Sequence, residues 1–122
     1  MDVRGIVWAG VRTEHVEETA RFFRDVMGFS ERELRSDFAW FTLPDGSQFE
    51  IFGLDEPDHR HFTTGPVPSF HVRDVHAAVE RLRAHGCETF GPWGEPTQGW
   101  AHFRAVDGNV YGLSAGAEYR RS

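Results

Sequence analysis

The sequence contains the same pattern twice, about sixty residues apart. A segment with helical spacing ends at Met27-Gly28-Phe29 and is followed by a tight Asp45-Gly46 turn. A second such segment ends at His85-Gly86-Cys87 and is followed by Asp107-Gly108. A unit of this size is too small to bury a sufficient core alone. We therefore expect one domain, residues 1–122, in which the two units pack together and function lies in the cleft between them.

Each unit is predicted to have the order β-α-β-β-β from its apolar periodicity and turn residues. The first contains a strand at 6–12, a helix at 15–27 and strands at 29–35, 38–43 and 47–52. The second contains a strand at 67–72, a helix from the N-cap Asp74 to Gly86, and strands from 88, at 100–105 and at 110–114. Module one thus covers about 5–54, a polar linker about 55–66, and module two about 67–115. A Gly/Pro-rich loop is expected to expose Trp93, and the tail 115–122 is expected to be frayed.

Composition and charge exclude several partners. The net charge is −6 and the arginines are scattered among acids, which argues against nucleic acid, because backbone recognition needs a clustered basic face. The single cysteine, Cys87, permits no intramolecular disulfide and fits a reducing compartment. No apolar run approaches membrane-spanning length. We therefore expect a cytoplasmic protein without a nucleic-acid or membrane partner.

Three motifs resemble those of one known superfamily. The run from Phe22 to Phe29, FFRDVMGF, resembles the Phe-Tyr-x-x-x-Leu-Gly-Phe helix end of the vicinal oxygen chelate superfamily. The runs 70–75, FHVRDV, and 107–111, DGNVY, are also typical of it. The resemblance covers about residues 5–115 and implies an α+β fold with two tandem βαβββ modules forming a curled mixed sheet around a cleft. It also implies a homodimer. The group includes glyoxalases, bleomycin-resistance proteins and dioxygenases, both metalloenzymes and metal-free binders, so fold alone does not decide function.

The resemblance places the metal ligands of related enzymes on the first and fourth strands of each module. In this sequence those places fall at Trp8, Glu50, Val67 and Gly112, within a residue or two, and only Glu50 can coordinate a cation. A catalytic divalent metal usually needs about three protein ligands. We therefore predict no metal and no cofactor.

The histidines leave one alternative open. His71 shares a strand face with Val67, and His102 is expected to point inward from a neighbouring strand. Glu50, His71 and His102 are therefore an alternative metal set, although hydrogen-bonding roles in the cleft or core are favoured. The remaining histidines are expected to be solvated surface residues: His15, His59, His61, His76 and His85.

Aromatic side chains are expected to line the cleft in place of metal ligands. Strand alternation puts Gln48, Glu50 and Phe52 on one face, and Trp8 on the neighbouring strand. Core packing is an equal alternative for each tryptophan. A carboxylate at Glu50 is costly to bury unless it is paired, and Arg12, His71 or a cationic ligand could supply the partner. The candidate ligand-binding residues are Trp8, Phe38, Trp40, Gln48, Glu50, Phe52, Ser69, His71, Trp93, Trp100 and His102.

Large rings with a few polar groups are what a small-molecule pocket needs. The sequence therefore favours a metal-free binding protein that holds an aromatic metabolite or antibiotic, aromatic or cationic, between the modules. The alternative is an enzyme (lyase, isomerase or dioxygenase-like) in which Glu50 and His71 act as acid and base, or in which the metal site is displaced.

Overall fold

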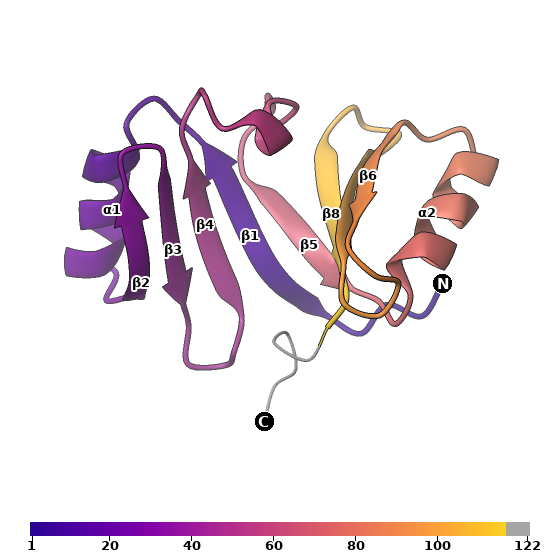
Figure 1. The fold of residues 1–122 in the computed structure, drawn as a ribbon, viewed down its shortest axis with the longest axis horizontal. Coiled ribbons are helices and arrows are strands. Elements are labelled where there is room, and N and C mark those ends of the chain that lie inside the picture. The colour runs from indigo at the N-terminus through magenta and orange to yellow at the C-terminus, as the bar shows by residue number, and fades with distance from the viewer. Residues whose placement is uncertain (117–122) are drawn as a thin grey trace.

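The computed structural model of this chain describes residues 1–116 (Figure 1). The first module contains β1 (Ile6–Arg12), α1 (Val16–Asp25), β2 (Ser30–Arg35), β3 (Phe38–Thr42) and β4 (Gln48–Phe52). The second contains β5 (Val67–His71), α2 (Val75–Ala84), β6 (Thr89–Trp93), β7 (Trp100–Arg104) and β8 (Val110–Ser114). A single 3-10 turn, η1 (Pro57–His59), lies in the linker. The predicted βαβββ order is confirmed in both modules.

All eight strands form one mixed sheet in the order β2-β3-β4-β1-β5-β8-β7-β6. The modules join where β1 pairs antiparallel with β5, while β1 with β4 and β5 with β8 are parallel pairs. The sheet curves between α1 and α2, which lie on its outer sides (Figure 1). The predicted curled, mixed α+β sheet is therefore confirmed.

Strand alternation divides the apolar side chains between three clusters. The core under α1 contains Val16, Ala20, Ala39, Phe41 and Ile51. The core under α2 contains Val72, Val75, Ala78, Val79, Ala101, Leu113 and Ala115. The third cluster contains Trp8, Phe52, Phe62, Val67 and Val110, which come from both modules and from the linker. This third cluster packs the modules against each other on the inner face of the sheet.

Two parts of the second module differ from the sequence prediction. β6 continues through Gly91 and Pro92, and Trp93 pairs with Trp100 on β7, so Trp93 is a half-buried strand residue rather than an exposed loop residue. Ala115, expected in a frayed tail, is fully buried, and the rest of that expectation, from residue 117 on, lies outside the described residues. Both described helices are ten residues long, and neither has the length and apolar character to cross a membrane.

Gly10 determines where the indole of Trp8 lies. The Trp8 side chain extends along β1 over Gly10, and a Cβ atom at residue 10 would overlap the outer indole ring. Gly10 is also the β1 residue that pairs with Glu50 on β4. The missing side chain at residue 10 therefore leaves the space through which Trp8 reaches Glu50.

We predict that Gly10→Ala lowers the free energy of unfolding by about 1–3 kcal/mol, the usual cost of overpacking a filled site. The cause is the overlap with the indole, so the same substitution should cost much less in a Trp8→Leu background, where the outer ring is absent. Chemical denaturation of both single variants and the double variant measures this coupling. Equal costs in the two backgrounds would show that Trp8 does not depend on Gly10.

Candidate functional site

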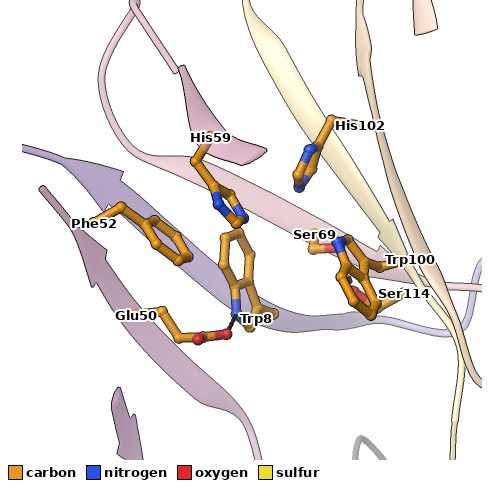
Figure 2. Close-up of a pocket in the computed structure, with 8 residues that line it drawn as sticks. All are labelled: Trp8, Glu50, Phe52, His59, Ser69, Trp100, His102 and Ser114. Carbon is orange, nitrogen blue, oxygen red and sulfur yellow. Dashed lines mark hydrogen bonds between the residues drawn. The ribbon is translucent and has the colours of Figure 1, made fainter. Parts of the chain in front are cut away.

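A cavity of about 180 Å³ lies on the inner face of the sheet, between the two modules. Strands of both modules and η1 supply its walls (Figure 2). The lining residues are Trp8, Glu50, Phe52, His59, Ser69, Trp100, His102 and Ser114. The cleft expected between the modules is therefore present, with aromatic rings and a small number of polar groups around it.

The Trp8 indole donates a hydrogen bond to Glu50 along one side of the cavity. The distance from Trp8 Nε1 to Glu50 Oε1 is 2.6 Å (Figure 2). Burial raises the pKa of Glu50, and the nearby carboxylates of Glu56 and Glu33 add to the rise, while the Trp8 hydrogen bond opposes it. Arg12, which the sequence offered as a partner for Glu50, instead donates from Nη2 to the Leu54 carbonyl at 3.2 Å. The carboxylate thus has a neutral donor as its partner.

His59 is a buried cavity residue, which corrects the expectation that it is solvated. η1 places its imidazole flat against Phe52, with ring centroids 3.6 Å apart. His59 Nδ1 lies 2.5 Å from Glu56 Oε2, and this carboxylate orients the ring. Burial lowers the pKa of His59 in spite of the opposing effect of Glu56. The imidazole is therefore neutral at neutral pH, and the bond at Nδ1 leaves Nε2 as its remaining polar atom.

His61 and His102 form a second imidazole pair beside the cavity. His61 Nε2 lies 2.8 Å from His102 Nδ1, so one ring donates to the other. Burial lowers the pKa of His102 to about 2 and that of His61 to about 4, and the neighbouring imidazoles add to both shifts. His61 also stacks on Phe90 at 4.0 Å and is half-buried, not solvated as expected. His15 and His85 are exposed as predicted.

Two serine hydroxyls complete the polar lining. Ser69 Oγ and Ser114 Oγ are 2.6 Å apart, and both residues are buried. Ser69 was predicted for the cleft, whereas Ser114 was missed. The sequence pattern could have indicated Ser114, because it lies two residues beyond Gly112 on β8 and therefore shares its face.

The structure brings some of the predicted ligand-binding residues together and leaves others apart. Trp8, Glu50, Phe52, Ser69, Trp100 and His102 line the cavity. Phe38 and Trp93 stand behind this lining, with Phe38 5.7 Å from Phe52 and Trp93 stacked on Trp100 at 6.0 Å between ring centroids.

Trp40, Gln48 and His71 lie elsewhere. Trp40 Nε1 donates to Gln48 Oε1 at 2.7 Å, so the indole N–H has its partner outside the cavity. His71 is the last residue of β5 and lines a separate hollow with Arg4, Arg73 and Gln98. His71, predicted to act with Glu50 as acid and base, is therefore not among the residues that line the cavity with Glu50.

The metal ligands of the resembled superfamily have no equivalent set here. Trp8 presents an N–H donor, and Val67 is a fully buried apolar side chain. A Cβ at Gly112 would lie 2.7 Å from Ser69 Oγ, so a longer side chain has no room. His71 is not among the residues that line the cavity, and His102 is bonded to His61. Within residues 1–116, no group of three or more His, Cys, Asp or Glu side chains is arranged to hold a metal ion. These residues do not fit a metal.

Comparison with known proteins connects this geometry to a family. A glyoxalase/bleomycin resistance protein/dioxygenase superfamily member from Vibrio splendidus 12B01 has a TM-score of 0.60 at 20% identity. The match covers 94% of this chain and 100% of that one. Methylmalonyl-CoA epimerase from Mycobacterium tuberculosis has a TM-score of 0.67 at 16% identity, with coverage of 94% and 89%. A variant of the Streptomyces coelicolor epimerase, in complex with 2-nitronate-propionyl-CoA, has a TM-score of 0.68 at 16% identity, with coverage of 99% and 100%. At sequence identities this low, the structural similarity shows a shared fold alone.

No curated protein sequence matches this chain. A family model, described as Glyoxalase/Bleomycin resistance protein/Dioxygenase superfamily, matches residues 5–111. The match runs from the residue before β1 to the second residue of β8, and so includes parts of both modules. The chain therefore belongs to the glyoxalase/bleomycin resistance protein/dioxygenase superfamily.

Proposed function

We propose that this protein binds a small aromatic molecule, without a metal, in the cavity between its modules. The observation that carries the proposal is the cavity wall: the rings of Trp8, Phe52 and Trp100 line a space that also contains a few polar groups. Large apolar planes supply contact area, and a few polar groups fix orientation. Each favourable ring contact contributes about 0.5–1.5 kcal/mol beyond area burial.

The size of the cavity supports a metabolite-sized ligand over a large antibiotic. A volume of about 180 Å³ is below the roughly 300–1,000 Å³ of drug-sized pockets. It is close to the engineered cavity of about 150 Å³ that accommodates benzene. A compound with one ring, or two fused rings, fits this space.

We predict that metal-free protein binds members of a panel of single-ring compounds that carry different charges: toluene, phenol, benzylamine and benzoate. Quenching of tryptophan fluorescence screens the panel, because Trp8 and Trp100 line the cavity. Calorimetry then gives the affinities. Trp100→Leu should weaken binding by about tenfold, since one ring contact and its buried area are lost.

Trp40→Leu is the matched control, because it removes an indole from the same sheet outside the cavity. This control should leave affinity within about twofold of the native protein, a difference well under 1 kcal/mol. Absence of any response across the panel, equal losses in the two variants, or a requirement for added metal would each contradict the proposal.

A second candidate function is proton transfer at carbon, and the Glu56–His59 pair favours it. His59 is neutral and held by a carboxylate at Nδ1, so Nε2 can take a proton from a carbon next to a carbonyl group. The electron pair then moves onto the carbonyl oxygen, to which a hydroxyl of the Ser69–Ser114 pair can donate a hydrogen bond. Return of the proton to carbon completes an isomerisation that needs no co-reactant. In this mechanism His59 has the acid–base role that the sequence predicted for His71.

For this candidate we expect the protein to accelerate exchange of the benzylic hydrogens of phenylacetaldehyde in deuterium oxide, followed by NMR. His59→Gln should abolish the acceleration, whereas His76→Gln, on the surface of α2, should not change it. Circular dichroism verifies that the His59 variant is folded. Exchange at the buffer rate with native protein would exclude this activity for the probe, and equal rates for native and His59→Gln protein would exclude His59 as the base.

We also propose that the protein is a symmetric homodimer. β2 and β6 are the edges of the sheet, and unpaired edges favour association. Phe22, Val26 and Met27 expose apolar surface at the end of α1. Light scattering coupled to size exclusion should give twice the chain mass of 13.9 kDa. A mass equal to one chain at micromolar concentration would contradict the proposal.

A further inference from the structure

Glu50 is a carboxylate that the fold desolvates without giving it a positive partner. One oxygen accepts from the Trp8 indole at 2.6 Å, and the residue lines the cavity (Figure 2). A buried carboxylate is costly unless a positive group or several donors compensate for lost water. A single neutral N–H provides part of that compensation.

The charges around Glu50 increase the cost of burying its carboxylate. The carboxylates that influence Glu50 are Glu56, beside η1, and Glu33, on β2, and both are negative. His59 and His102 face the same cavity, but burial keeps both imidazoles in the neutral form. Arg12 is engaged with the Leu54 carbonyl. Within the part of the chain that the structure describes, no cation lines the cavity.

The rings next to Glu50 are also suited to a cation. Trp8 and Phe52 lie side by side with centroids 6.2 Å apart, and Trp100 forms another part of the wall. The face of an aromatic ring carries negative potential and attracts ammonium groups, and tryptophan does so best. A cation bound by a carboxylate among aromatic faces therefore makes both an ion pair and cation–π contacts. Both interactions strengthen when water is excluded.

We propose that the ligand of this cavity is a small organic cation, an aromatic compound that carries an amine or quaternary ammonium group, and that Glu50 binds its positive charge. The inference rests on the aromatic-binding function proposed above and specifies the charge of the ligand. The ammonium group supplies the partner that Glu50 lacks, and the ring occupies the space between Trp8, Phe52 and Trp100.

The test compares three single-ring probes of similar size and different charge: benzylamine, benzyl alcohol and benzoate. At neutral pH, calorimetry should show benzylamine binding at least about tenfold more tightly than benzyl alcohol, because a charge-assisted contact exceeds a neutral one by over 1 kcal/mol. Benzoate should not bind. Glu50→Gln should reduce benzylamine affinity to that of benzyl alcohol and leave benzyl alcohol unchanged. Glu33→Gln is the matched control, since it removes a nearby carboxylate that does not line the cavity.

The outcomes separate the two proposals. Equal binding of benzylamine and benzyl alcohol, or equal losses of both in Glu50→Gln, overturns the charge inference and leaves the aromatic-binding function in place. Absence of binding by all three probes, together with no response to the wider panel, overturns both.

The unliganded protein offers a second readout. Glu50 has a higher pKa folded than unfolded, so its contribution to stability is lost as pH rises from about 4.5 through the folded pKa. The amide in Glu50→Gln can still accept from Trp8 but carries no charge to desolvate. We expect this variant to melt about 2–5 °C higher than native protein at neutral pH, with the difference shrinking towards the acid end. A lower melting temperature at neutral pH would show that the fold already compensates the charge, and would overturn the inference.

Discussion

The hydrogen bond between Trp8 and Glu50 determines the shape and the polarity of the inner face. It joins neighbouring parallel strands of module one, and it exists because Gly10, which pairs with Glu50, leaves room for the indole. The indole then packs with Phe52, Phe62 and Val110, so one contact links module one to the linker and to module two. The position of a single indole therefore determines both the packing between modules and the environment of the buried carboxylate.

The second module uses a glycine in a comparable way. Gly112 pairs with Ser69 on one side and His102 on the other, and the Ser69 side chain fills the space that a Cβ at residue 112 would take, with His102 in contact next to it. Replacing Gly112 by a carboxylate would therefore displace the Ser69–Ser114 hydrogen bond as well as crowd His102. The inner face is packed closely around Trp8 and Gly112, so building a metal site there would require coordinated changes at several positions.

Strand periodicity was sufficient to predict the residues whose side chains depend only on which face of a strand they occupy, such as Glu50, Ser69 and His102. His71 shares that face but is the last residue of β5, and it lines a separate hollow instead of the cavity. Strand periodicity could not find His59, because a linker has no period and this ring is buried through tertiary contacts with Phe52, Phe62 and His102. Gly91 and Pro92 were interpreted as loop residues, yet β6 is an edge strand, where the missing N–H of proline is tolerated.

The chemistry of the cavity follows from which of its groups burial leaves charged. Burial lowers the pKa of an imidazole and raises that of a carboxyl, so His59 and His102 are neutral at neutral pH and Glu50 is harder to ionise than in water. A cationic ligand of the kind proposed would therefore compete with a proton for the same carboxylate, and its binding would favour release of the proton. An amide oxygen at residue 50 can accept the Trp8 hydrogen bond as a carboxylate oxygen does. The charge at residue 50 can therefore change without loss of the Trp8 contact. Ligand charge can thus be selected at one residue while the fold and the cavity shape are maintained by Trp8 and Gly10.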